Sequence, residues 1–334
     1  MTQPLTKKAG VFASPALIAL LAYLNKERTM NKRIITIITI SAALLLGACA
    51  PTAAREADVA LIDGLGREVA LPAPAETIVS LSPPVTEMLY AVGAGEQVVG
   101  RDTFSDYPAE TADLPDVGGG FSDYDLETIL SLQPDLVIAG EINTPELVQS
   151  LADLDLAVYY LANPDDLAGT FDAIRTIGTL SGHEQEAETL TADLEARVQS
   201  VEESLASVET RPTVYYELDA TDPAKPYTPG PGTFYTAMIE QAGGANVGAE
   251  LDSEWAQVSL EFLLVRDPQY ILLGDAMWGV TPESIAERPG WDALTAVKEE
   301  RVLPFDDNLI ARIGPRQVDG LEALAQILHP EAFK

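Results

Sequence analysis

The chain has 334 residues, of which 47% are hydrophobic and 22% are charged, a composition typical of a globular protein with one large or two medium domains. Its 52 acidic residues outnumber 20 basic ones and give a formal net charge of −32, which opposes binding to the phosphates of nucleic acids. A single cysteine excludes an intramolecular disulfide and a cysteine-based metal site, and two histidines argue against a multi-histidine site.

The N-terminal region has the features of an export signal. A short basic segment, Met30–Arg33, is followed by the apolar segment Ile34–Leu46, which is short for a membrane span. Small residues then lead to Cys49, in an order that resembles a bacterial lipobox. We therefore expect residues 30–48 to be a lipoprotein signal peptide and Cys49 to be lipidated. The mature protein would be exported and anchored on the outer face of the cytoplasmic membrane.

The residues around this signal have no expected fold of their own. Residues 1–29 precede a signal that is complete without them, so we interpret them as a mis-annotated extension. Residues 49–60 are expected to be a linker. Residues 1–48 hold six basic residues and one acidic residue, which leaves 14 basic and 51 acidic residues in the mature chain. Such acidity suits a saline habitat, or it keeps an exported protein dispersed by charge repulsion.

Residues 61–163 alternate between short apolar segments and helical patterns. The segments expected to form strands are Ile78–Leu81, Val98–Gly100, Leu136–Ala139 and Ala157–Leu161. The segments expected to form helices are Thr86–Val92, Asp125–Leu132 and Pro145–Leu151. Nearly continuous apolar strands that alternate with helices predict a parallel sheet covered on both faces, and hence an N-terminal α/β lobe.

Residues 164–210 contain no strand pattern between Asp165 and Leu205 and are expected to form a helical bridge. One apolar stripe follows a helical spacing of three and four residues, through Leu190, Leu194, Val198, Val201 and Leu205. This stripe predicts a long helix from about His183 to Ser207, which would span roughly 37 Å at 1.5 Å per residue. Ser181-Gly182 is expected to separate it from an earlier helix over Leu167–Leu180.

The alternation returns in residues 211–334, which are expected to form a second α/β lobe. Strands are expected at Thr213–Leu218, Tyr270–Gly274 and Arg301–Phe305, and helices at Thr233–Ala242 and Gln317–Leu328. The sequence thus predicts an α/β protein of two lobes joined by a long helix.

Motifs for nucleotide binding or nucleophilic catalysis are absent from the sequence. It has no G-x-S-x-G, no P-loop and no G-x-G-x-x-G that opens a helix. His183 and His329 are expected to lie at the surface. A binding protein is therefore favoured over an enzyme. The alternatives from other classes are an exported metal-dependent α/β hydrolase and a surface adhesin without a small-molecule ligand.

Five segments carry a resemblance to a known family. They are Asp63–Val69, Ile78–Gly93, Ser105–Pro108, Asp125–Val137 and Gln257–Glu261. In this order they resemble the substrate-binding proteins of ABC importers for vitamin B12, haem and ferric siderophores, and the members that bind vitamin B12 look most similar. The resemblance implies the class III periplasmic-binding-protein fold, in which two Rossmann-like lobes are joined by one backbone helix. It also implies a ligand held in the cleft between the lobes.

The resemblance further implies the partners of the protein. These are an ABC permease, its ATPase subunits and the membrane, reached through the lipid anchor, and we expect a monomer. One glutamate per lobe, Glu87 and Glu261, is implied as an exposed carboxylate at a helix start that pairs with arginines of the permease.

Candidate ligand-binding residues come from the resemblance and from loops expected to face the cleft. Trp255 and Arg312 match family positions, whereas Phe121 and Asn308 stand where vitamin B12 binders have tryptophan and aspartate. The aromatic residues expected on cleft-facing loops are Phe104, Tyr107, Tyr227 and Phe234. Aromatic side chains around a wide cleft suit a flat, large and partly apolar ligand.

The three ligand classes of the family need different chemistry. Ferric siderophores are often anionic and need several basic residues, which the mature chain can hardly supply. Haem needs an axial tyrosine or histidine, for which Tyr107, Tyr124 or Tyr227 could serve. A corrinoid such as cobalamin brings its own cobalt and base, so it needs aromatic contacts and a few hydrogen bonds. A corrinoid is therefore the favoured ligand, with haem or a ferric siderophore as the alternative and no intrinsic cofactor or metal.

Overall fold

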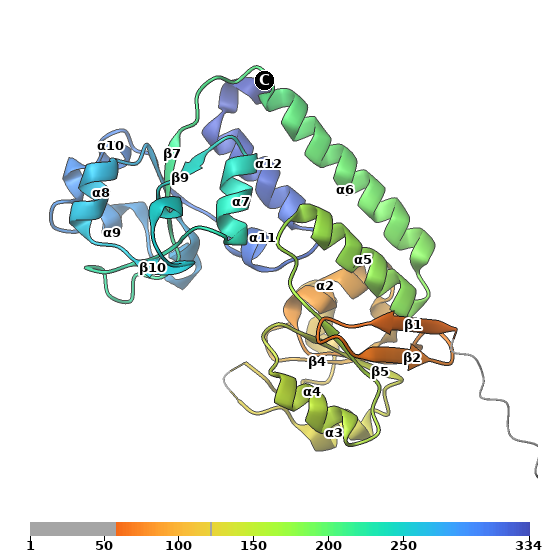
Figure 1. The fold of residues 1–334 in the computed structure, drawn as a ribbon. Coiled ribbons are helices and arrows are strands. Elements are labelled where there is room, and N and C mark those ends of the chain that lie inside the picture. The colour runs from red at the N-terminus through yellow and green to blue at the C-terminus, as the bar shows by residue number, and fades with distance from the viewer. Residues whose placement is uncertain (1–57, 121) are drawn as a thin grey trace, which may run out of the picture. The chain divides into compact units, whose positions relative to one another are not determined.

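The computed structural model describes residues 58–120 and 122–334. The expected signal peptide, the residues before it, Cys49 and Phe121 lie outside the described residues. The chain divides into a unit of residues 1–56 and a unit of residues 57–334, and the fold described below belongs to the second unit. This unit contains two four-stranded sheets, one in each lobe (Figure 1).

The first lobe is built on a parallel sheet in the order β4-β3-β5-β6. Its strands are β3 (Ile78–Ser80), β4 (Val98–Arg101), β5 (Leu136–Gly140) and β6 (Val158–Leu161). Its helices are α2 (Pro83–Ala91), α3 (Leu126–Ser131) and α4 (Pro145–Ala152). Every residue of β5 is buried, as expected for a strand covered on both faces, so the predicted parallel sheet is confirmed. An antiparallel hairpin that sequence reasoning missed precedes it, formed by β1 (Val59–Ile62) and β2 (Glu68–Leu71).

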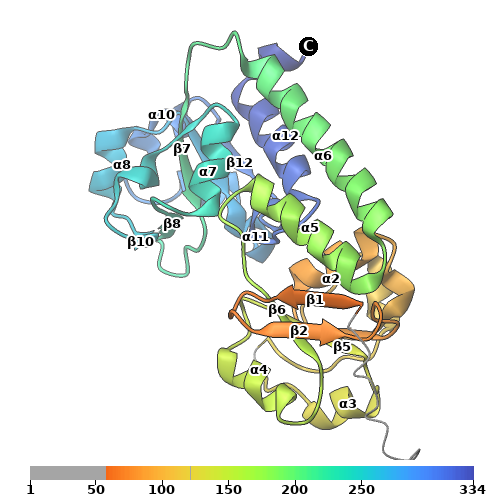
Figure 2. The ribbon, with the colours of Figure 1, turned by 45° about the vertical axis from the view of Figure 1, so that its right-hand side comes forward.

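Two consecutive helices connect the lobes. The first, α5 (Leu167–Ser181), ends at Gly182, whose φ of 75° lies in the left-handed region that glycine adopts readily. The second, α6 (Glu184–Leu205), has 22 residues and is about 33 Å long. It packs against α5 and against α12 (Gln317–Leu328), the closing helix of the second lobe (Figure 2). The predicted long helix and the break at Ser181-Gly182 are confirmed.

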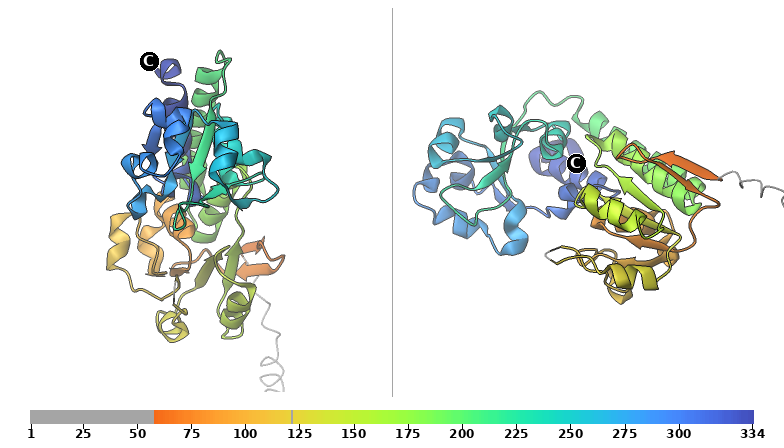
Figure 3. Two further views of the ribbon diagram at one scale, coloured as in Figure 1. Left: turned by 90° about the vertical axis from the view of Figure 1, so that its left-hand side faces the viewer. Right: turned by 60° about the horizontal axis from the view of Figure 1, so that its bottom comes forward.

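The second lobe repeats the architecture of the first. Its parallel sheet has the order β12-β11-β7-β9. The strands are β7 (Thr213–Glu217), β9 (Ala245–Asn246), β11 (Tyr270–Leu273) and β12 (Val302–Pro304). The helices are α7 (Phe234–Gln241), α8 (Leu260–Arg266), α9 (Pro282–Ala286), α10 (Thr295–Lys298), α11 (Asn308–Ala311) and α12. A small antiparallel pair, β8 (Tyr227–Pro229) and β10 (Trp255–Gln257), lies outside the parallel sheet. Figure 3 shows this lobe and the first in two further views.

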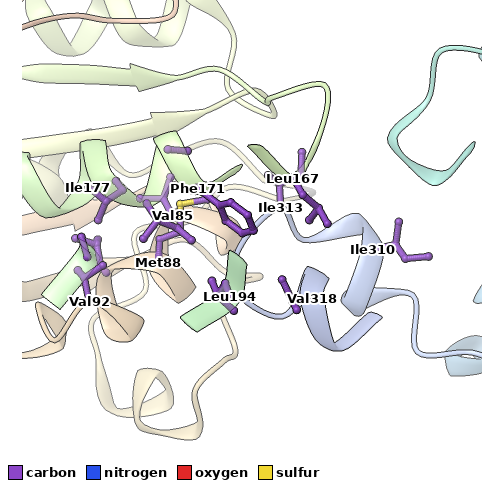
Figure 4. Packing of buried hydrophobic residues seen from close by; sticks show 14 of the residues in the cluster. Val85, Met88, Val92, Leu167, Phe171, Ile177, Leu194, Ile310, Ile313 and Val318 are labelled. Carbon is purple, nitrogen blue, oxygen red and sulfur yellow. The ribbon is translucent and has the colours of Figure 1, made fainter. Parts of the chain in front are cut away.

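The hydrophobic core continues from one lobe into the other. Val85 and Met88 of α2 belong to the same buried cluster as Phe171 of α5, and so do Ile313, which follows α11, and Val318 of α12 (Figure 4). Buried apolar surface contributes about 25 cal/mol per Å², so separation of the lobes would lose part of this stabilisation. The lobes are therefore joined by packed side chains as well as by the connecting helices.

None of the helices in the described part of the chain combines the length and the apolar character needed to cross a membrane.

His329 was expected at the surface, but it is buried, and its Nε2 lies 3.1 Å from the carbonyl oxygen of Gly243. The surface expectation for His329 is therefore wrong, because the end of α12 packs against the turn after α7.

Candidate ligand-binding cleft

A pocket between the lobes brings together segments that are distant in the sequence. We call it the interlobe pocket; its volume is about 370 Å³. The first lobe contributes Glu141, after β5, and Asn163–Asp165, after β6. The second lobe contributes the start of α7, the β10 strand and the end of α11, with the lining residues Gly232, Thr233, Phe234, Tyr235, Glu254, Trp255, Ile310, Ala311 and Ile313. Segments that follow parallel strands are the usual ligand-binding positions of such sheets.

Two of the expected ligand-binding aromatics, Phe234 and Trp255, lie in the interlobe pocket. Trp255 is 52% exposed, and its ring and that of Tyr235 form a T-shaped pair with centroids 5.9 Å apart. The position of Tyr235 is held by a hydrogen bond, because its hydroxyl donates to Oδ1 of Asp307 at 2.9 Å. The hydroxyl of Tyr216 donates to the same oxygen, also at 2.9 Å. Burial raises the pKa of Asp307, against the lowering effect of these two hydroxyl groups. Sequence reasoning missed this support of Trp255.

The expected residues Tyr107 and Arg312 take part in a different cluster, at the lobe boundary. Tyr107 is 45% exposed, and the guanidinium of Arg316 lies 4.1 Å from its ring centroid. Arg312 donates to Asp106 at 2.5 Å and to Glu87 at 3.2 Å. Arg312 is therefore held in ion pairs within the protein.

The remaining expected residues are scattered around the two clusters. Phe104 follows β4 and is 40% exposed, and Tyr227 begins β8 and is 42% exposed. The Asn308 side chain donates to Asp306 at 3.0 Å and so closes its own turn. The structure thus places Phe234 and Trp255 in one pocket and the other described residues outside its lining.

The expectation of an exposed Glu87 at a helix start is wrong. Two prolines occupy the first two positions of α2 after Ser82, so the helix begins three residues before the expected Thr86 and places Glu87 in its second turn. The Glu87 side chain is 2% exposed. Its carboxylate accepts hydrogen bonds from Arg316, from Nε at 2.8 Å and from Nη2 at 2.6 Å, in addition to that from Arg312. Glu87 therefore ties the first lobe to the second.

Glu261 differs from Glu87 in each of these respects. It lies in the first turn of α8, whose N-cap Ser259 accepts a hydrogen bond from the backbone N–H of Phe262 at 3.3 Å. Glu261 is exposed, as expected from the sequence. A carboxylate in this position interacts favourably with the N-terminal end of the helix dipole.

A second pocket, in the second lobe, was not expected from the sequence. We call it the acidic pocket; its volume is about 400 Å³. It lies at the carboxyl ends of β7 and β11 and is lined by Leu218, Asp219, Ala220, Thr221, Asp275, Trp278 and Val280. Trp278 is 79% exposed, whereas Asp275 is 3% exposed. The sequence signal that could have predicted this pocket is an acidic residue and an aromatic residue, Asp275 and Trp278, shortly after the buried strand β11.

The acidic pocket adjoins the β8–β10 pair that carries Trp255. Asp219 forms a β-bridge with Tyr227, and the backbone N–H of Leu218 donates to the carbonyl of Tyr227 at 2.9 Å. Trp255 stands opposite Pro229 in the same pair of strands. The segment that lines the acidic pocket is therefore joined by backbone pairing to the strands that carry Trp255. Within residues 58–120 and 122–334, no group of three or more His, Cys, Asp and Glu side chains is arranged to hold a metal ion.

Comparison with known proteins identifies the family. Residues 78–309 match the periplasmic binding protein family. The ABC transporter substrate-binding lipoprotein YvrC of Bacillus subtilis is 30% identical over 281 residues, which cover 83% of this chain and 87% of YvrC. Two solved structures are also similar. The vitamin B12 binding protein BtuF of Vibrio cholerae has a TM-score of 0.66 at 28% identity and covers 79% of this chain and 100% of BtuF.

The second structure is the haem-binding protein RhuT of Roseiflexus sp. RS-1. It has a TM-score of 0.69 at 29% identity, over 77% of this chain and 99% of RhuT. The two-lobed α/β architecture with a connecting helix is the class III periplasmic-binding-protein fold of these neighbours. The chain belongs to the periplasmic binding protein family and is a substrate-binding component of an ABC transporter.

Proposed function

We propose that this protein captures a corrinoid such as cobalamin between its lobes and delivers it to the permease of an ABC importer. The charge of the cleft supports this proposal most strongly. Arg312 and Arg316, the arginines at the lobe boundary, are both bound to Glu87. An anionic ligand would have to compete with that carboxylate, whereas a neutral ligand with a flat body needs only the exposed aromatic side chains.

Haem is the second candidate, because RhuT is as similar in sequence as BtuF. The carboxylates of haem would be repelled by Asp219 and Asp275 of the acidic pocket, and its iron would need an axial ligand. Tyr124 is poorly suited, since its hydroxyl donates to the carbonyl of Leu81 at 3.1 Å and burial raises its pKa to about 12. Tyr107 and Tyr227 are exposed and keep haem as a candidate.

The same proposal includes the position of the protein in the cell. Lipidation of Cys49 would hold the monomeric receptor beside its permease. Glu261 would bind an arginine of the permease, because it is exposed at the start of α8. Docking through Glu87 would require a permease arginine to replace Arg312 or Arg316 at the buried carboxylate. A transport role needs no catalytic group, and we propose no enzymatic activity.

The test is a calorimetric titration of the purified protein with cyanocobalamin, haemin and a ferric hydroxamate siderophore. We expect a Kd for cyanocobalamin below about 1 μM, equivalent to roughly −8 kcal/mol, and weaker binding of the other two. Tight binding of haemin without binding of cyanocobalamin would replace the proposed ligand by the second candidate. Binding of none of the three would contradict the proposal.

A further inference from the structure

The acidic pocket contains a buried carboxylate that is incompletely paired. Asp275 is 3% exposed, and its Oδ2 accepts a hydrogen bond from the backbone N–H of Ala220 at 3.1 Å. Its Oδ1 is buried and has no hydrogen-bond partner among the described residues. A buried oxygen acceptor without a partner is unfavourable, so a hydrogen-bond donor from a bound molecule would be favoured there.

The charges around Asp275 do not compensate it. Glu217, at the end of β7, is fully buried. Its carboxylate accepts hydrogen bonds from both Nη groups of Arg288, at 2.6 and 2.8 Å. Arg288 therefore forms its ion pair with Glu217. Asp275 is a second buried acid beside this pair, and it has no ion pair of its own among the described residues. Burial, followed by the charge of Glu217, raises the pKa of Asp275 to about 7, against the smaller lowering effect of Arg288.

The rest of the acidic pocket favours a neutral group with N–H donors and an apolar body. Asp219 and Thr221, at the rim, are exposed, and Asp219 adds a second carboxylate. The indole of Trp278, 79% exposed, offers a flat apolar surface beside them. A carboxylate or phosphate group would be repelled by Asp219. At pH 8, above the raised pKa of Asp275, it also has no hydrogen to donate to the free oxygen of the ionised Asp275.

We propose that the acidic pocket is a specificity subsite that binds a primary amide of the cargo, with Asp275 accepting its N–H and Trp278 packing against its apolar neighbourhood. This inference rests on the proposed function, since a corrin ring carries side-chain amides where haem carries carboxylates. Asp275 would thus distinguish amide-bearing from carboxylate-bearing tetrapyrroles.

The variant Asp275→Asn tests the direction of this hydrogen bond. The Ala220 N–H requires an oxygen at the Oδ2 position, so the amide nitrogen of asparagine would occupy the Oδ1 position. The group offered to the ligand would change from an acceptor to a donor, with almost no change in shape. The ligands are cyanocobalamin and its isomeric monocarboxylic acids, in each of which one propionamide is hydrolysed to a carboxylate.

For the wild type, we expect at least one monocarboxylic acid to bind about tenfold more weakly than cyanocobalamin, in calorimetric titrations at pH 8. For Asp275→Asn, cyanocobalamin should lose about tenfold in affinity, and the preference over that acid should disappear or invert. Asp193→Asn, at an exposed position on α6, is the matched control and should behave as the wild type. Trp278→Ala should bind cyanocobalamin about tenfold more weakly than the wild type, with an unchanged Tm. If Asp275→Asn does not fold, the affinity of Trp278→Ala tests the subsite in its place.

The outcomes separate this inference from the proposed function. If the wild type does not bind cyanocobalamin, the proposed function fails and the inference fails with it. If the wild type binds cyanocobalamin but Asp275→Asn keeps its affinity and its order of preference, the subsite is wrong and the proposed function stands. Unchanged cyanocobalamin affinity in Trp278→Ala would also contradict the subsite.

Discussion

Two buried carboxylates, Glu87 and Asp275, show how differently one protein can treat an acidic side chain. Counted over the whole residue, Glu87 is 4% exposed and Asp275 is 3% exposed. Glu87 accepts hydrogen bonds from two arginines of the other lobe, whereas Asp275 receives one from a backbone N–H at 3.1 Å. The paired carboxylate joins the lobes, and the unpaired one lines a pocket. Burial alone therefore does not tell whether an acid is structural; the number of donors around it does.

The largest effect on the isolated protein is expected from Glu87→Ala. This change leaves the guanidinium groups of Arg312 and Arg316, whose side chains are each 16% exposed, without their shared partner. Removal of one member of a buried ion pair costs about 3–5 kcal/mol. Urea unfolding should show this loss in the free energy of unfolding. A loss below about 1 kcal/mol would mean that the pairing at the lobe boundary contributes little.

Arg316→Lys tests the same ion pair with a smaller change. Lysine keeps the positive charge but cannot make the two-pronged contact with Glu87 or stack over Tyr107 as a planar group. We expect a loss of about 1–2 kcal/mol in the free energy of unfolding. Arg175→Lys, in the exposed ion pairs between α5 and α6, is the control and should change stability by less than about 0.5 kcal/mol. Equal losses in the two variants would remove the distinction between buried and exposed pairs.

The unpaired carboxylate should appear in the pH dependence of stability. Asp275 has its pKa raised from 3.8 to about 7 by burial and by Glu217, against the opposing effect of Arg288. Between these two values the folded protein holds a proton that the unfolded chain has released. The contribution of Asp275 to the free energy of unfolding should therefore decline as pH rises from about 4 to 7.

The measurement is the free energy of unfolding from pH 5 to pH 8 for the wild type and for Asp275→Asn. Asparagine does not titrate, so the variant should gain stability relative to the wild type as pH rises. Parallel profiles for the two proteins would show that Asp275 is ionised in the folded protein throughout this range. The nearby Glu217 and Arg288 are present in both proteins, so the difference reports Asp275 together with its interactions with these two groups.

The smallest effect on the isolated protein is expected from Glu261→Gln. Since Glu261 is exposed at the start of α8, the free energy of unfolding of the variant should differ from that of the wild type by less than about 0.5 kcal/mol. Its affinity for the cargo should not change. Stimulation of the ATPase of the cognate transporter should nevertheless fall. Full stimulation by this variant, with Glu283→Gln as an exposed control, would contradict a docking role for Glu261.

The sequence predicted the architecture well, because the information lies in local patterns. Apolar runs such as Leu136–Ala139 correspond to strand β5, and the stripe from Leu190 to Leu205 corresponds to α6. The short β8–β10 pair could not be predicted, since its register depends on contacts between Tyr227–Pro229 and Trp255–Gln257, which α7 and β9 separate in the sequence.

The candidate site was predicted less well, because its contacts are long-range. Arg316 meets Glu87 across 229 positions in the sequence, and no local pattern shows that this carboxylate is buried. Trp255 was found through a motif, whereas Trp278 and Asp275 stand in no motif. They could have been proposed from their place immediately after the buried segment Tyr270–Leu273, where parallel sheets bind ligands.

A crystal structure of the protein with cyanocobalamin would show directly whether the corrinoid binds between the lobes. We expect the ligand to lie between the lobes, in contact with Trp255 in the interlobe pocket and with Trp278, and we expect one of its amides to donate to Oδ1 of Asp275. A corrinoid bound to one lobe alone, or at a surface remote from both tryptophans, would contradict this expectation.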